Sequence, residues 1–280
     1  MTTTAHRTTL VVGGTGKTGA RVVRRLRALD VPVRVGVPSG EPPFDWEDRS
    51  TWAPALRGTT AAYITYPPDI TVPGAAAAIA EFSELAVLTG TRRLVLLSGR
   101  GEAEAQRAER ALQSSGADWT VVRCAWFDQN FSEGNFLGPL LAGELALPAD
   151  SELEPFVDAD DIADVAAAAL TEDGHAGRVY ELTGPRLLTF ADAVEEIARA
   201  TGRDLRHRSI SLPDFEADLA AAGVPEEVVD ILRLLFTEVL GYSAAIADGV
   251  QRALGRPPRD FAEFAREAAA AGVWSPGVAA

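Results

Sequence analysis

The sequence contains few of the residues that build disulfides, metal centres and nucleic-acid interfaces. It has one cysteine, one methionine and three histidines in 280 residues, and its net charge is −14 at pH 7. A single cysteine excludes an intrachain disulfide, which is typical of a protein from a reducing cytoplasm. The acidic balance argues against nucleic acids and anionic membranes as partners. The expected partner is therefore a small molecule, and the oligomeric state stays open between a monomer and a homodimer.

Signals for export and for membrane insertion are also lacking. The polar segment 1–9 has no apolar stretch of the kind that a signal peptide needs. Longer apolar runs are interrupted by charge, proline or glycine well before they reach membrane-spanning length. We therefore expect a cytoplasmic protein, and its 47% of hydrophobic residues are sufficient for a large core.

A glycine-rich motif follows the first apolar run of the chain. The run 8–12 predicts a strand, Gly13, Gly16 and Gly19 follow it, and an apolar stripe over 22–29 predicts a helix. Such a turn lets backbone N–H groups approach a phosphate, to which the helix N-terminus adds partial positive charge. The order strand, Gly-x-x-Gly-x-x-Gly, helix therefore indicates a dinucleotide site.

The same loop also resembles the end of a nucleoside-triphosphate loop, because Gly16, Lys17 and Thr18 are consecutive. That motif needs a glycine five residues earlier, where Val11 stands. Lys17 is moreover the only lysine of the chain, and its place in the loop favours contact with a phosphate. The choice between NAD and NADP stays open. Ser39 stands near the end of the second strand, where an acid would bind the ribose hydroxyls of NAD and an arginine would bind the 2′-phosphate of NADP.

Alternation of strands and helices predicts a doubly wound, parallel α/β sheet with helices on both faces. The expected elements of the first half, after the first helix, are a second strand over 31–37, a helix over 50–56, a short third strand without a clear run, a strand over 61–65, a helix over 73–89, a strand over 92–98, a helix over 102–115 and a strand over 119–123. The second half predicts helices over 160–170, 190–201, 213–222, 225–240, 243–254 and 261–271, with strands over 179–183 and 207–211. We expect a core of residues 1–130 and a smaller, mainly helical lobe of residues 131–280, partly interleaved with it, that caps the strand ends.

Several segments together resemble the NmrA-like family of atypical short-chain dehydrogenases/reductases. They are 13–19, 114–123, 127–131, 156–166 and 255–261, and they span nearly the whole chain. The resemblance implies a Rossmann-type fold and binding of NAD or NADP. The sequence departs from the family at Pro38, where many relatives have an arginine for the 2′-phosphate, and at Cys124, where a proline is common.

The candidate cofactor positions come from the motif, the strand ends and the resemblance together. They are Gly13, Thr15, Gly16, Lys17, Thr18, Ser39, Asp45, Trp46, Tyr66, Pro67, Ser98, Cys124 and Trp126. Among these, the resemblance implies that Asp45 and Trp46 lie near the adenine, and that the segment 124–127 lies near the nicotinamide.

The usual proton donor of short-chain dehydrogenases, a tyrosine activated by a lysine four residues later, is missing. Pro67, Ile70, Gly184 and Ile246 stand at that spacing from the four tyrosines. Ser98 and Asn130 are the remaining catalytic candidates, the first with a loop hydrogen bond and the second with a helix cap as the alternative role. Trp126, Phe127, Asn130 and Phe131 are the candidate substrate contacts, whereas core packing of the smaller lobe is favoured for Trp119.

No metal site is expected. Asp158, Asp160, Asp161 and Asp164 stand where acids complement a helix N-terminus, and the three histidines have no metal-ligand spacing. Two functions remain. The first is an NAD(P)H-dependent oxidoreductase that acts on a planar conjugated carbonyl, a quinone or an aromatic polyketide-like compound; the second is a regulator that senses the dinucleotide without turnover.

Overall fold

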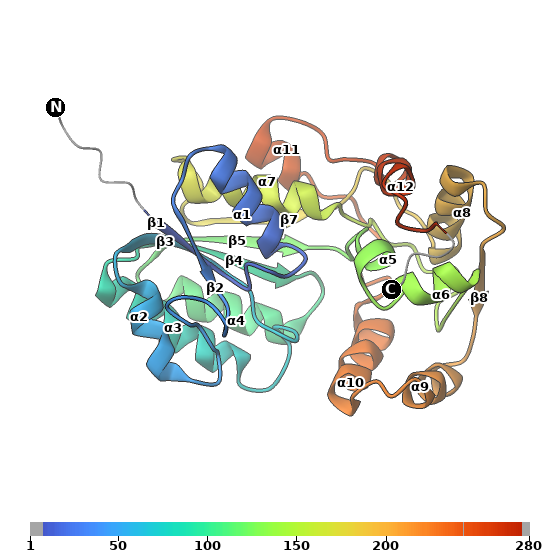
Figure 1. Ribbon diagram of the computed structural model, residues 1–280, viewed down its shortest axis with the longest axis horizontal. Helices are drawn as coiled ribbons and strands as arrows, with labels where there is room; N and C mark the ends of the chain where they lie inside the picture. Colours follow the sequence, from blue (N-terminus) through green and yellow to red (C-terminus); the bar gives the residue numbers. More distant parts are fainter. Residues whose placement is uncertain (1–7, 243, 276–280) are drawn as a thin grey trace. The chain divides into compact units, whose positions relative to one another are not determined.

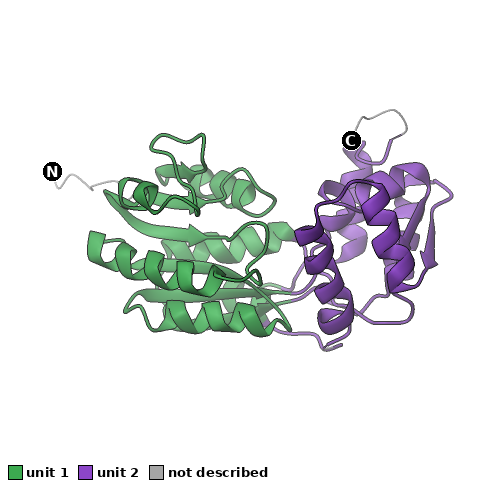
Figure 2. Cartoon of the chain, turned by 90° about the horizontal axis from the view of Figure 1, so that it is seen from below, with its two compact units in different colours: residues 1–124, 159–182, 249–256 green, residues 125–158, 183–248, 257–280 purple. Residues whose placement is uncertain are grey.

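The structure is a computed structural model that describes residues 8–242 and 244–275. The chain forms two compact units (Figure 2). Unit 1 comprises residues 1–124, 159–182 and 249–256, and unit 2 comprises residues 125–158, 183–248 and 257–280. The expected boundary at residue 130 and the capping role of the lobe stay predictions.

A parallel sheet forms the centre of unit 1. Its strands are β1 (Thr8–Val12), β2 (Val33–Gly36), β3 (Thr59–Ile64), β4 (Arg93–Gly99), β5 (Asp118–Cys124) and β7 (Arg178–Leu182), in the order β2-β1-β3-β4-β5-β7. All neighbouring pairs run parallel. Leu10, Ile64, Leu94 and Val121 are fully buried, as expected for a sheet that is covered on both faces. The predicted doubly wound fold is confirmed.

Two layers of helices cover this sheet (Figure 1). One face carries α2 (Trp52–Leu56), α3 (Ala75–Thr89) and α4 (Ala103–Gln113), and the other carries α1 (Gly19–Ala28), α7 (Ala159–Thr171) and α11 (Gly249–Leu254). A 3₁₀ turn over Arg49–Thr51 precedes α2. The α1 helix buries Val22, Val23 and Leu26, the stripe that the sequence predicts.

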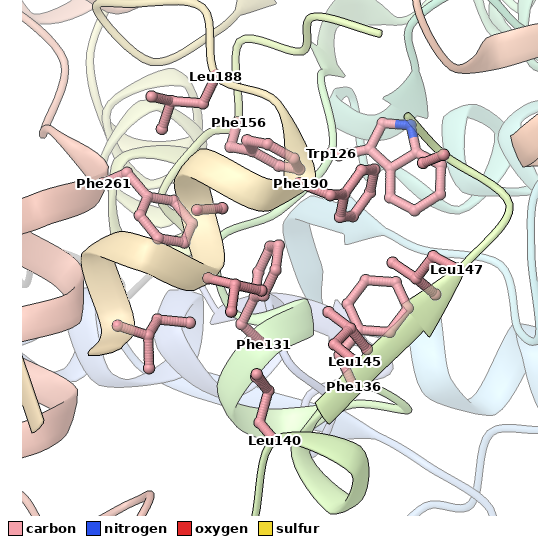
Figure 3. Packing of buried hydrophobic residues seen from close by; sticks show 14 of the residues in the cluster. Trp126, Phe131, Phe136, Leu140, Leu145, Leu147, Phe156, Leu188, Phe190 and Phe261 are labelled. Atoms are coloured by element: carbon pink, nitrogen blue, oxygen red, sulfur yellow. The ribbon is translucent and has the colours of Figure 1, made fainter. Parts of the chain in front are cut away.

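Unit 2 is mainly helical and has a core of its own. It contains α5 (Asn130–Glu133), α6 (Leu137–Ala142), β6 (Glu144–Leu147), α8 (Phe190–Thr201), β8 (Arg206–Ser209), α9 (Leu212–Ala221), α10 (Glu226–Leu234), a π-helical turn (Leu235–Val239) and α12 (Phe261–Ala270). The strands β6 and β8 form a parallel pair. Aromatic side chains dominate the core, with Phe131, Phe156 and Phe190 packed edge to face or tilted at centroid distances of 5.1–5.8 Å (Figure 3).

Three expectations about these elements were wrong. The short third strand expected before residue 61 is absent: residues 37–58 form no strand, and Phe44 and Trp46 pack in the core of unit 1 instead of pairing with the sheet. The helix expected over 243–254 begins only at Gly249, and Ser243 lies outside the described residues. Ala247 N donates to Thr183 Oγ1 at 3.0 Å, and the same hydroxyl donates to Ala247 O at 3.3 Å, so this residue is bonded to Thr183 and not within a helix. Trp119 packs against the core of unit 1 and not of the smaller lobe.

A last observation on the fold concerns membranes. In the ranges 8–242 and 244–275, no helix has the length and apolar character needed to cross one.

Candidate dinucleotide-binding site

The glycine-rich loop lies where the strand order of the sheet reverses. From β1 the chain moves outward to β2, and it then returns to the other side of β1 to form β3. In an open parallel sheet, ligands bind at the carboxyl ends of the strands at such a switch point. The loop 13–18 leaves the carboxyl end of β1 and leads directly into α1, so it opens onto this position.

Two of the three motif glycines are required by the backbone itself. Gly13 has a φ of +67°, and a Cβ there would overlap the hydroxyl of Thr65. A Cβ on Gly19 would overlap the carbonyl of Gly13, because the first turn of α1 packs directly against the loop. Gly16 differs, since its Cβ would meet only Gly13 O, at 3.3 Å. Gly16 and the neighbouring Thr15 are exposed, as a phosphate-binding turn requires.

Hydrogen bonds hold the loop in place from below. Gly13 N donates to Gly36 O at 2.8 Å, and Gly16 N donates to Gly13 O at 2.9 Å. Thr65 Oγ1 donates to Val12 O at 3.1 Å, and Tyr63 Oη donates to Thr18 Oγ1 at 3.1 Å. The Thr18 side chain is thereby engaged inside the protein, which leaves its backbone for a ligand. Burial raises the pKa of Tyr63 far above its usual value, so this phenol stays protonated.

Lys17 and the following helix complete the loop. The Lys17 carbonyl accepts a hydrogen bond from Arg21 Nη1 at 2.8 Å, and the Lys17 residue is partly exposed. The turn exposes Thr15 and Gly16 at the N-terminus of α1, an arrangement that fits the pyrophosphate of a nicotinamide dinucleotide. The roles of the individual loop residues in binding the cofactor stay predictions.

The expected adenine-side residues occupy two different environments. Ser39 is exposed, and Asp45 is partly exposed with its carboxylate accepting from Glu47 N at 3.0 Å. The Trp46 ring is 7% exposed, its Nε1 donates to Thr65 O at 3.0 Å, and it packs on Tyr66 at 4.8 Å between centroids. Trp46 thus supports the loop through Thr65.

Tyr66 and the exposed Pro67 follow the end of β3 directly. They share the sheet edge with the loop.

Ser98, near the carboxyl end of β4, is buried in a hydrogen-bonded group with a carboxylate. Its Oγ donates to Glu109 Oε1 at 2.6 Å, and Arg123 Nε donates to the same oxygen at 2.9 Å. The hydroxyl proton of Ser98 is therefore committed to Glu109, so delivery of that proton to a substrate requires this bond to break. Its cofactor and catalytic roles stay predictions.

A second buried acid, Glu102, lies between the end of β4 and the start of α4. Glu102 is 8% exposed, and its carboxyl group lies directly over Gly99, where any Cβ would overlap it. Its Oε2 is buried without a hydrogen-bond partner. Burial, together with the nearby carboxylates of Asp69 and Glu109, raises the pKa of Glu102 to about 8. At neutral pH this carboxyl group is protonated.

Cys124 ends β5 beside this acid, in register with Gly99. Burial and the charge of Glu102 raise the pKa of the Cys124 thiol well above its usual value. Its Sγ donates to Val122 O at 3.7 Å. A buried neutral thiol is a poor nucleophile, so Cys124 can offer packing and backbone contacts only.

The remaining candidates belong to unit 2. Phe131 is fully buried, and its carbonyl accepts from Trp274 Nε1 at 2.9 Å. Trp126 is 8% exposed, and its Nε1 has no partner. Phe127 and Asn130 are partly exposed. The substrate and catalytic roles of these residues, and the cofactor contact of Trp126, stay predictions.

The acids at the start of α7 form ion pairs with arginines. Asp160 contacts Arg25 at 2.8 Å, Asp164 contacts Arg25 and Arg256 at 2.6 Å each, and Asp161 contacts Arg256 at 2.7 Å. They join α7 to α1 and to the segment after α11. Asp158, in unit 2, accepts from Gln129 Nε2 at 2.8 Å.

The histidines are dispersed. His175 Nδ1 shares a hydrogen bond with Tyr180 Oη at 2.9 Å, His207 lies in β8, and His6 lies outside the described residues.

Tyr63, Thr65, Glu102 and Glu109 are the residues of this edge that sequence reasoning missed. A usable signal existed for Glu109, because its spacing from Ala105 and Leu112 places it on the buried face of α4. Glu102 is the N-cap residue of this helix and lies outside that pattern.

Comparisons with known proteins relate the whole chain to one group. No family model matches the sequence. The NAD(P)H azoreductase of Xenophilus azovorans is 30% identical, and the alignment covers 94% of this chain and 98% of that protein. The chain belongs to the NmrA-like family of atypical short-chain dehydrogenases/reductases. The expected family is thereby confirmed.

Solved structures agree in fold. The NADPH-dependent quinone oxidoreductase from Escherichia coli, in complex with NADPH, has a TM-score of 0.76 at 22% identity and covers 92% of this chain and 99% of that chain. NmrA, a negative transcriptional regulator, in complex with NAD has a TM-score of 0.71 at 18% identity, with coverage of 98% and 99%. This NmrA-like chain therefore has the same fold as proteins whose structures hold either dinucleotide.

Proposed function

We propose that this NAD(P)-dependent oxidoreductase reduces a planar conjugated acceptor: a quinone, an azo compound, or an aromatic polyketide-like carbonyl compound. NAD or NADP is its cofactor, held by the loop 13–18, and when bound it supplies the hydride. The 30% identical relative is named an azoreductase, and an azo compound belongs to the same chemical class of flat, delocalised acceptors.

The observation that carries this proposal is that no tyrosine has a lysine four residues later, because Lys17 is the only lysine of the chain. Two tyrosines are moreover engaged elsewhere: Tyr63 is buried and bound to Thr18, and Tyr180 shares a hydrogen bond with His175. Reduction of a simple ketone gives an alkoxide, whose high basicity requires a strong proton donor in place. Reduction of a quinone or azo compound gives a delocalised anion of much lower basicity, which does not need that pair.

The experiment compares matched acceptors under one set of conditions. NADH and NADPH oxidation is followed with 1,4-naphthoquinone, methyl red and cyclohexanone at equal concentrations. We expect turnover of the first two to exceed that of the ketone by at least about 100-fold, the range that general acid catalysis spans. Faster reduction of cyclohexanone would contradict the proposal.

A regulator that binds the dinucleotide without turnover is the alternative function. It is supported by the missing tyrosine-lysine pair and by the fold shared with NmrA. Tight binding of NAD or NADP without reduction of any acceptor would favour it. A cytoplasmic location and the absence of nucleic-acid partners remain part of the proposal, on the single cysteine and the net charge of −14.

A further inference from the structure

The carboxyl ends of β3, β4 and β5 bring several proton-bearing groups to the sheet edge onto which the dinucleotide loop opens. Tyr66 follows β3, Ser98 and Glu102 lie at and just after the end of β4, and Cys124 ends β5. Reduction of a conjugated acceptor by hydride transfer consumes one proton for each hydride. One of these groups, or water, must supply it.

Most of these groups are unsuited to give up a proton. The hydroxyl of Ser98 donates to buried Glu109 at 2.6 Å. The thiol of Cys124 is buried and its pKa is raised well above its usual value, so it releases its proton only to a very strong base. Burial likewise raises the pKa of Tyr66 above the ordinary value of a phenol.

Glu102 differs from these groups in geometry. Its carboxyl group occupies the space above Gly99 that any other residue's Cβ would fill, and Oε2 there is buried without a hydrogen-bond partner. Gly99 pairs with Cys124 at the last register position of β4 and β5. The absence of a side chain at position 99 therefore lets the acid lie against the end of β4, at the carboxyl edge of the sheet and away from bulk water.

We propose that Glu102, from its place over Gly99, donates the proton that the acceptor takes up during reduction. This role rests on the proposed function. The acceptor receives the hydride and its electron pair from the reduced cofactor, a heteroatom of the acceptor forms an O–H or N–H bond, and the Oε–H bond of Glu102 breaks. The cofactor is oxidised and the acceptor is reduced by two electrons. Water then returns a proton to the Glu102 carboxylate.

The charges around Glu102 agree with this assignment. Its neighbours Asp69, Glu109 and Cys124 come from the loop after β3, from α4 and from β5. The arginines of the same strand ends are bound to other acids, Arg123 to Glu109 and Arg100 to Glu181 at 3.1 Å. Burial and like charge thus raise the pKa of Glu102 to about 8, and the group carries its proton at pH 7.

The test compares Glu102→Gln with Glu104→Gln, a control on the same helix whose carboxylate pairs with Arg107 on the surface. Naphthoquinone reduction by the unaltered protein should stay constant below pH 8 and fall about tenfold per pH unit above it. Glu102→Gln should lower kcat by about 100-fold at pH 7, abolish this pH dependence, and leave dinucleotide affinity in calorimetry unchanged. Glu104→Gln should match the unaltered protein. Glu102→Asp should retain more activity than Glu102→Gln.

A readout without cofactor or turnover separates this proposal from the proposed function. Infrared spectra of the dinucleotide-free protein should show the carbonyl stretch of a protonated carboxyl group that disappears near pH 8. The band should be absent from Glu102→Gln and present in Glu104→Gln. A kcat of Glu102→Gln within threefold of the unaltered protein, or the lack of the band, would overturn the donor role alone. Failure of the unaltered protein to reduce any acceptor would overturn the function, and the donor role with it, whereas the band would still report the buried acid.

Discussion

At the scale of single residues, the position of Lys17 is the main support for a phosphate contact in the loop. The chain has 26 basic residues, of which 25 are arginines. Many of those arginines bind acids of the protein itself, as Arg25 and Arg256 do on α7. Lys17 instead lies in the partly exposed loop between β1 and α1, where an ammonium group can follow a phosphate as a compact point charge.

Substitution of Lys17 should show whether this residue contributes to the affinity for NAD, for NADP or for both. Lys17→Ala should weaken the preferred dinucleotide by about ten- to a hundredfold, since a hydrogen bond to a charged group contributes about 1.5–3 kcal/mol. Titration calorimetry with NAD and NADP measures the effect, and Lys17→Arg serves as the charge-conserving control. A loss confined to NADP would assign Lys17 to the 2′-phosphate. Equal affinities before and after the substitution would remove Lys17 from the site.

At the scale of elements, the loop and α1 behave as one piece because their glycines have different duties. Gly19 lets the helix pack on the Gly13 carbonyl, whereas Gly16 is exposed and a Cβ there would meet a single protein atom, Gly13 O, at 3.3 Å. Gly16→Val should therefore abolish dinucleotide binding while the melting temperature changes little. Gly19→Ala should lower the melting temperature, because loop and helix must move apart. Calorimetric binding together with thermal unfolding of both variants checks this contrast, and unchanged affinity of folded Gly16→Val would contradict the site.

The elements also show how far the sequence could lead. Continuous apolar runs predicted β1, β4 and β5 to within a few residues, because these strands are buried on both faces, and helical periodicity predicted α1 and α8, which each bury one apolar stripe. The prediction of a short third strand was wrong, because the aromatic residues of the segment 37–58 pack in the core through tertiary contacts that leave no periodic pattern. The loop was predictable from local spacing. Glu102 was not, because its burial depends on Gly99 and on the neighbouring strands β3 and β5.

At the scale of the whole molecule, the buried acid couples stability to pH. The pKa of Glu102 is about 8 in the folded protein, against the ordinary value of 4.5 for a glutamate. A group whose folded-state pKa is raised gives stability that is complete below the unfolded pKa and is lost as pH rises through the folded pKa. The contribution of Glu102 to the free energy of unfolding therefore falls by about 1.4 kcal/mol per pH unit between the unfolded and the folded pKa, and it levels off above the folded pKa.

Glu102→Gln should remove this dependence. The stability advantage of the variant over the unaltered protein should be small near pH 5, should grow toward pH 8, and should reach a few kcal/mol there. Urea unfolding at pH 5.5, 7 and 8.5 measures it, and Glu104→Gln should show no such trend. Because the two proteins differ only at position 102, the difference between their free energies of unfolding reports the ionisation of Glu102. Parallel curves at all three pH values would mean that Glu102 ionises normally.

The division of unit 1 into three stretches of chain has a consequence for synthesis on the ribosome. The first 124 residues emerge with five of the six strands of the sheet, but β7 and the covering helix α11 follow only with residues 159–182 and 249–256. At about 5–20 residues per second, the nascent sheet waits on the order of ten seconds with the outer edge of β5 unpaired. Translation speed and chaperone capture during that interval thus bear on the yield of folded protein, and a chain that stops short of residue 256 lacks the last piece of its own nucleotide-binding unit.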